Sequence, residues 1–203
     1  ILPLLGVALA LGLAFASFLP LHGRKLRTVK LPVWGMVIAH FGIAVALFGM
    51  ACDAAFTKER LVAARPGDTV AVGPWKVTFQ TIVPVAGPNW TAMEATLQAS
   101  YSGSKARELH PQARTFWAPV QETNESALAT RWNGQLYAVL GDQGEDGRWQ
   151  LRLWWKPFVT LIWYGGLLIA LGGFLAMLGR LASDLRRIVA RDKIAYRRTR
   201  QGR

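Results

Sequence analysis

The chain has 203 residues, of which 52% are hydrophobic, and its 24 lysines and arginines against 12 acidic residues give a formal net charge of +12. A soluble nucleic-acid-binding domain could carry this charge, but it would not contain three uncharged stretches of more than twenty residues. We therefore expect a membrane protein that does not bind nucleic acid. The single cysteine, Cys52, excludes an internal disulfide framework and a Cys-x-x-Cys redox pair.

Three segments contain no Asp, Glu, Lys or Arg and predict transmembrane helices: residues 1–23, 31–52 and 157–179. A hydrocarbon core of about 30 Å needs roughly 20 helical residues, so each segment is long enough to span it. The first segment lacks the basic leader and the small-residue cleavage site of a signal peptide. Because the chain opens on Ile1 and not on a methionine, we expect it to be a piece of a longer protein.

Most of the net charge lies outside these helices. Residues 24–30 carry +4 and residues 180–203 carry +7, whereas the long segment 53–156 carries only +1. Lysine and arginine accumulate on the cytoplasmic side, so we predict a cytoplasmic basic loop, a cytoplasmic basic tail and an extracytoplasmic segment 53–156. Within the tail, residues 183–194 can form a membrane-surface helix whose apolar side holds Leu185, Ile188 and Val189.

The second helix, residues 31–52, carries His40 near the predicted middle of the bilayer. An ionisable side chain at that depth is a candidate functional residue, and neutral imidazole is a common axial ligand of haem iron. A histidine that only hydrogen-bonds a neighbouring helix is the alternative. Small residues recur at spacings of three and four and form one narrow face, able to admit a close helix or a flat macrocycle: Gly35, Ala39, Gly42, Ala46 and Gly49.

The extracytoplasmic segment has a β pattern. Runs of alternating, β-branched or aromatic residues at 70–80, 91–101, 136–140 and 149–154 predict strands, and turn signals such as Asn133-Gly134 separate them. We predict one all-β domain over residues 53–156, a small antiparallel barrel or sandwich. Trp154 and Trp155 precede a membrane entry and predict an interfacial aromatic anchor.

The sequence contains none of the common catalytic signatures of hydrolases, metalloproteases or phosphate-binding loops, so it identifies no catalytic residue. Two further histidines favour a solvated or structural role, because neither has another candidate ligand nearby in the sequence. They are His22, at the cytoplasmic boundary, and His110, in the β domain.

Motifs in collinear order carry a resemblance to a known family. The helix Trp34-Gly-Met-Val-Ile-Ala-His-Phe-Gly-Ile-Ala44 resembles the Trp-Gly-Met-x-x-Ala-His-x-Gly helix of the CcmF-type cytochrome c haem lyases. Further similar motifs follow in the same order: Pro66-Gly67-Asp68, Gly87-Pro88-Asn89-Trp90, Pro111-Gln-Ala-Arg114, Leu136 to Asp142, Trp149 to Phe158, and Ile162-Trp163-x-Gly165 with Gly172-Gly173. The resemblance covers the carboxy-terminal portion of that family.

This resemblance implies a multi-pass protein of the inner (cytoplasmic) membrane that attaches haem covalently to apocytochrome c. It implies a periplasmic β domain that docks partners, a haem chaperone that delivers haem, and thiol-handling maturation subunits that present the apocytochrome. It also implies that quinol supplies electrons through a transmembrane b-type haem, haem b. The family motif carries onto His40 as one axial ligand of that haem iron.

The chain departs from the family in one motif and lacks others. Pro111-Gln112-Ala113-Arg114 stands where the family has Pro-Glu-Lys-Arg. The tryptophan-rich haem-handling motif, the paired outer-face histidines and the second b-haem ligand have no counterpart, so we expect them in an upstream part of the same protein and expect this portion alone to be inactive. Two other functions remain open: a non-enzymatic membrane assembly subunit in which His40 only packs, and a ligand-binding transporter or sensor module.

Overall fold

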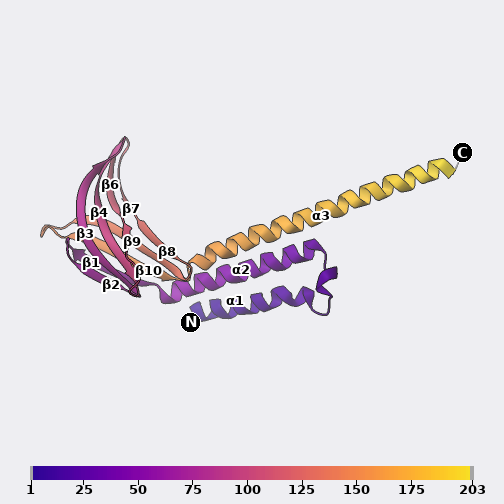
Figure 1. Cartoon of the computed structure of the whole chain (residues 1–203), viewed down its shortest axis with the longest axis horizontal. Helices are drawn as coiled ribbons and strands as arrows, with labels where there is room; N and C mark the ends of the chain where they lie inside the picture. The colour runs from indigo at the N-terminus through magenta and orange to yellow at the C-terminus, as the bar shows by residue number, and fades with distance from the viewer. Residues whose placement is uncertain (1, 202–203) are drawn as a thin grey trace. The chain divides into compact units, whose positions relative to one another are not determined.

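The computed structural model describes the backbone of residues 2–201 and the side chains of residues 2–187. The chain divides into two compact units: a helical unit, Ile1–Ala51 with Leu161–Arg203, and a β unit, Cys52–Thr160 (Figure 1). The β unit is therefore an insertion between the second and third helices of the helical unit.

Three long helices form the helical unit: α1 (Leu2–Phe18), α2 (Leu31–Phe56) and α3 (Thr160–Gln201), with two short 3₁₀ turns, η1 (Leu19–Leu21) and η2 (Leu26–Thr28), between the first two. The spans Leu2–Leu21, Leu31–Phe56 and Thr160–Arg187 are long and apolar enough to cross a membrane. α3 continues as one helix through the basic tail, and the side chains of Ile188 and Val189 lie outside the described residues.

Glycines bring the backbones of α2 and α3 into direct contact. A Cβ built on Gly35 would lie 2.5 Å from the carbonyl oxygen of Gly172, and one built on Gly42 would lie 2.7 Å from that of Gly165. We call these four residues the glycine seam. Small residues at a helix interface let backbones approach closely in lipid. The small-residue face of α2, for which a helix or a flat macrocycle was expected, is thus covered by α3.

The β unit is a sandwich of two antiparallel sheets. One sheet has the strand order β1-β10-β9-β8, and the other has the order β2-β3-β4-β6-β7 with β5 also paired to β4. The strands are β1 (Lys58–Ala64), β2 (Thr69–Val72), β3 (Trp75–Ala86), β4 (Trp90–Tyr101), β5 (Arg107–Leu109), β6 (Gln112–Trp117), β7 (Val120–Glu125), β8 (Ala127–Arg131), β9 (Gly134–Gln143) and β10 (Trp149–Pro157). The predicted fold class, apolar helices with a small antiparallel β domain, is confirmed.

Alternate residues of both sheets face each other and form the core of the sandwich. β10 shows this alternation along its whole length, with buried and less buried residues in turn. The largest fully buried side chains come from both sheets: Trp75, Phe79 and Leu97 from one, and Leu136, Leu140, Leu151 and Leu153 from the other. Burial of these apolar side chains is the main stabilising contribution to the β unit.

The structure corrects two predictions at one end of this core. Residues 70–80 are not one strand but the β2–β3 hairpin, which turns at Gly73 with φ +55°. Trp155 is not an interfacial anchor, because it is 6% exposed and its ring lies 6.3 Å from that of Trp75 and 5.8 Å from that of Tyr101. A Cβ on Gly73 would lie 2.6 Å from the Trp155 ring, so glycine is needed at this turn.

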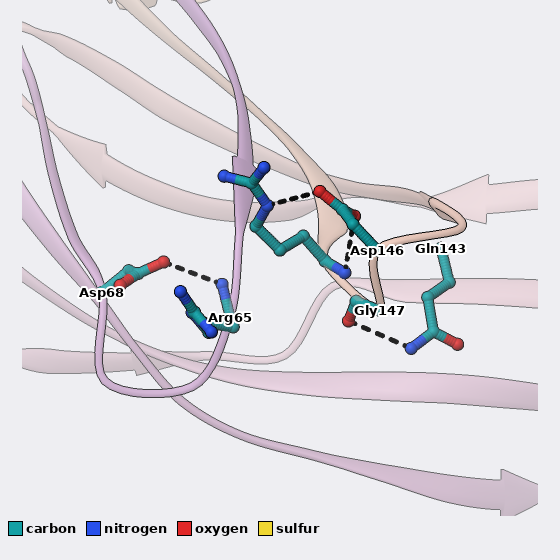
Figure 2. Close-up of polar contacts among 6 residues, drawn as sticks. Arg65, Asp68, Gln143, Asp146 and Gly147 are labelled. Carbon is teal, nitrogen blue, oxygen red and sulfur yellow. Dashed lines mark hydrogen bonds and ion pairs between the residues drawn. The ribbon is translucent and has the colours of Figure 1, made fainter.

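Polar side chains hold two turns of the sandwich (Figure 2). An Asp68 carboxylate oxygen accepts the backbone N–H of Arg65 at 3.0 Å. The Asp146 carboxylate accepts the backbone N–H of Arg148 at 3.1 Å and its Nε–H at 2.6 Å. The backbone and side-chain hydrogen bonds from Arg148 hold the pKa of Asp146 below its usual value. One turn follows the end of β1 and the other follows the end of β9. Hydrogen bonds within each turn therefore satisfy backbone groups that no neighbouring strand pairs with.

Candidate functional site

His40 lies in α2 with an exposed side chain and makes one hydrogen bond within its own helix. Its Nδ1 is 2.8 Å from the carbonyl oxygen of Met36, one turn earlier. A carbonyl oxygen can only accept a hydrogen bond, so Nδ1 is the donor and carries a proton. In the neutral imidazole this leaves Nε2 with a free lone pair, the form in which histidine binds a metal.

A small hollow between α1 and α2 borders His40. Its volume is about 200 Å³, and its lining consists of Leu13, Ala16, Ser17, Pro20, Met36 and His40. The hydroxyl of Ser17 donates to the carbonyl oxygen of Leu13 at 2.6 Å and so already has an acceptor. Among these six side chains, the imidazole of His40 is the group best suited to bind a ligand.

Two contacts fix α1 beside α2 around this hollow. The rings of Phe18 and Phe41 lie 5.4 Å apart. A Cβ on Gly6 would lie 3.0 Å from the Cβ of Ala51. The later residue of α1, Phe18, contacts the earlier residue of α2, Phe41, and the earlier residue Gly6 contacts the later residue Ala51, as an antiparallel pair requires. The hollow is therefore a feature of packed helices, which present apolar walls on both sides of His40.

The structure does not bring the other histidines to His40. His22 lies in the connection after η1 and does not line the hollow. His110 belongs to the β unit, where its Nδ1 lies 3.6 Å from a Glu94 carboxylate oxygen and its Nε2 lies 3.9 Å from one of Glu108. Among the described residues no group of three His, Cys, Asp or Glu side chains could hold a metal ion. His40 is the candidate ligand that this part of the chain offers.

A polar network crosses β4, β6 and β7 of the β unit. Glu94 lies at one side of it, where it accepts a hydrogen bond from the Gln112 amide and lies close to His110. The Gln112 carbonyl oxygen accepts the Nε–H of Arg114 at 2.7 Å. Arg114 in turn lies 3.2 Å from a Glu125 carboxylate oxygen. Charged and polar side chains therefore form one connected network across β4, β6 and β7.

Gln112 explains how the chain accommodates its departure from the Pro-Glu-Lys-Arg motif. An amide can donate to Glu94 and accept from Arg114 at once, whereas a carboxylate at this position would repel Glu94. The Arg114 guanidinium also lies 4.3 Å from the centre of the Trp90 ring. The sequence analysis predicted no strand here and missed this network, because residues 112–125 do not show the regular alternation of polar and apolar residues that indicates a strand.

Comparison with known proteins places this chain among cytochrome c biogenesis proteins. Residues 55–157 match the family model of the CcmF C-terminal beta-sandwich. The cytochrome c-type biogenesis protein CcmF of Escherichia coli is 36% identical over 175 residues, which are 85% of this chain and 27% of the relative. CcmF of Pseudomonas aeruginosa is 36% identical over 76% of this chain and 23% of the relative. CycK of Bradyrhizobium diazoefficiens is 35% identical over 80% and 25%.

A solved structure, the cytochrome c heme lyase CcmF, has the same fold over most of the chain. The TM-score is 0.68 at 23% sequence identity, and the match covers 85% of this chain and 30% of the other. This chain thus spans about a quarter of the length of the curated relatives and under a third of the solved chain.

Proposed function

The chain belongs to the CcmF family, and from this premise we propose that it is the carboxy-terminal portion of a cytochrome c haem lyase, which attaches haem covalently to apocytochrome c. In this proposal His40 supplies one axial ligand to a transmembrane b-type haem, and the β unit docks maturation partners. The observation that carries it is the state of His40: its Nδ1–H is bonded to the Met36 carbonyl, and its Nε2 is available, in a helix of membrane-spanning length.

The residues around His40 fit a haem only in part. The lining is apolar apart from His40 and the satisfied Ser17, which suits a macrocycle with a largely hydrophobic surface. The hollow of about 200 Å³ is smaller than the roughly 300–1,000 Å³ of typical cofactor sites. We therefore infer that the opposite wall and the second axial ligand come from the full-length protein.

Each nearby residue has a definite task in this proposal. The Met36 carbonyl fixes the tautomer and the ring orientation of His40, so that Nε2 is the nitrogen left for a ligand. The apolar lining offers a hydrophobic surface against which a flat macrocycle can pack. A b-type haem, when bound, supplies single-electron transfer, for which quinol is the proposed donor. In this proposal the packed helices α1 and α2 hold the imidazole of His40 in position.

We infer the location and the partners from charge and family. The basic residues of 24–30 and 180–203 support a cytoplasmic position for both segments and a periplasmic position for the β unit, in the inner membrane. The proposed partners of the whole protein are a haem chaperone, apocytochrome c and its thiol-handling maturation subunits, together with the upstream part of the same protein. The network around Gln112 and Arg114 is the surface that we expect a partner to contact.

Replacement of His40 tests the ligand proposal. In the full-length protein, His40→Gly should abolish the reduced b-haem absorbance while the protein still inserts into the membrane. Added imidazole should restore that absorbance in the Gly variant, because the missing side chain leaves room for a free ligand. The measurement is the reduced-minus-oxidised spectrum of purified protein.

Matched controls are His22→Gly and His110→Gly, which remove histidines that do not line the hollow. Both should keep the parent spectrum. An unchanged spectrum in His40→Gly would reject the ligand role and favour the assembly-subunit function in which His40 only packs.

A further inference from the structure

The chain enters and leaves the β unit at one end of the sandwich. β1 begins at Lys58, which is paired with Trp155, and β10 ends at Pro157, which is paired with Gly134. The hydroxyl of Thr160, the first residue of α3, donates to the carbonyl oxygen of Trp132 at 2.8 Å. We call this the membrane-proximal end of the β unit, because the candidate spans α2 and α3 continue from it.

Two large aromatic side chains are exposed at the membrane-proximal end. Trp132, in the β8–β9 turn, is 73% exposed, and Phe56, the last residue of α2, is 58% exposed. A tryptophan so exposed contributes little to the stability of a domain in water. At the surface of a bilayer the same ring is favourable, because it is apolar and carries one N–H for the headgroup region. Trp132 thus has the properties that the sequence suggested for Trp155.

Exposed basic side chains lie at the same end of the β unit. Four exposed basic side chains lie at or near this end and have no carboxylate within 4.0 Å among the described side chains: Lys58, Arg60, Lys76 and Lys105. An unpaired cation at a surface is available to an anionic partner. The membrane-proximal end of the β unit is therefore basic, although the total charge of the unit is close to neutral.

The carboxylates at this end are already paired. Asp53 lies 3.6 Å from the Lys156 ammonium, and Glu59 lies 2.6 Å from Arg152 Nε. Neither is free to neutralise Lys58 or Arg60. The positive charges of Lys58 and Arg60 therefore stay unpaired, because both nearby carboxylates already form ion pairs with other residues.

A groove between the edge strands β1 and β2 presents two of these cations. Its volume is about 460 Å³, and it is lined by Lys58, Glu59, Arg60, Ala71, Val72 and Gly73. Arg131 lies on β8, at the other edge of this sheet from β1, and its guanidinium stacks 4.4 Å from the centre of the Tyr101 ring.

We propose that the membrane-proximal end binds the phosphate groups of anionic phospholipids. Lys58 and Arg60 contact headgroups at the groove, and Trp132 places its ring in the interface of the same leaflet. A soluble anion would account for the cations but not for the exposed tryptophan, whereas a lipid surface accounts for both. The occupant is the membrane that α2 and α3 are expected to cross, so it is within reach of this end by chain connectivity.

Tryptophan quenching by brominated lipids tests this proposal. The protein is reconstituted into vesicles of shallow-brominated phosphatidylcholine, with or without about a third of phosphatidylglycerol. The signal of Trp132 is the difference between the parent and Trp132→Phe. We expect this difference to be quenched in the anionic vesicles, and the quenching to be lost in high salt, which screens charges at the bilayer surface.

Charge variants locate the headgroup site. Lys58→Gln with Arg60→Gln should lower the ratio of engaged to free β units about 25-fold, since each basic residue near an anionic surface contributes about fivefold. Arg65→Gln, at a turn on the opposite end of β1, is the matched control and should leave the quenching unchanged. Circular dichroism checks that each variant is folded. Equal quenching of Trp132 in both kinds of vesicle, or full quenching after loss of both charges, would overturn the proposal.

Discussion

Glu59 and Arg152 lie on the neighbouring strands β1 and β10, where Arg152 Nε donates to a Glu59 carboxylate oxygen at 2.6 Å. This hydrogen bond, assisted by the charge of Arg152, holds the pKa of Glu59 below its ordinary value of 4.5. A carboxylate with a lowered pKa stabilises the folded state fully above its ordinary pKa. The contribution is lost as the pH falls through the lower, folded-state value.

Glu59→Gln should therefore lower the unfolding midpoint of the protein at pH 7 by a small amount, because the pair is exposed to solvent. The difference from the parent should shrink below pH 4.5 and vanish once Glu59 is protonated in the folded state. Thermal unfolding at several pH values measures this effect. Glu122→Gln is the control, since Glu122 is exposed and has no ion pair among the described side chains, and it should show no such pH dependence.

At the scale of whole elements, the glycine seam joins α2 and α3. A Cβ on Gly172 would lie 2.5 Å from both the Ala39 nitrogen and the Gly35 oxygen, which are backbone atoms that cannot turn away. The adjacent Gly173 has nothing within 4 Å of such a Cβ. One helix therefore carries a glycine in the contact and a matched glycine outside it.

Gly172→Ala should push α3 away from α2 and destabilise the helical unit by about 1–3 kcal/mol, the usual cost of overpacking. Gly173→Ala should be neutral or slightly stabilising, because alanine is the better helix former. Unfolding in mixed micelles with increasing denaturing detergent measures both variants. Equal stability of the two would mean that the backbones are not in contact.

Elements differ in how well the sequence predicts them. The absence of charge predicted all three long helices, and alternation predicted β4, β9 and β10, since these properties are local. β6 to β8 were missed because residues 112–131 are largely polar, and these strands form through pairing, β6 with β4 and β7, and β8 with β9. The prediction for Trp155 was wrong for a related reason. Its side chain points into the core because of the register of β10 in the sheet, and the sequence Trp-Trp-Lys-Pro alone does not reveal that register. The depth of His40 in its helix predicts a site residue, which stays a prediction, and its hydrogen bond to Met36 is a feature that the sequence does not show.

At the scale of the molecule, each unit contains its own contacts. His40, its hollow and the glycine seam belong to the helical unit, whereas the sandwich core and the polar network belong to the β unit. This division separates the two proposed roles, ligand binding and partner docking.

Replacement of Lys58–Pro157 by a short flexible linker in the full-length protein tests the separation. The reduced b-haem spectrum should persist, because no residue that lines the hollow is removed. Co-purification of maturation partners should be lost. The absorbance spectrum and the partner yield are measured on the same preparation, and loss of the spectrum would show that the helical unit depends on the β unit.

The insertion of the β unit between α2 and α3 sets an order of events during synthesis. The whole β unit, which ends at Thr160, the first residue of α3, must be made before the rest of that helix leaves the ribosome. At roughly 5–20 residues per second this takes on the order of ten seconds. During that time Gly35 and Gly42 of α2 lack their contacts with α3. Glycine suits this delay, because it exposes no polar side chain to lipid and needs no rotamer change when α3 arrives.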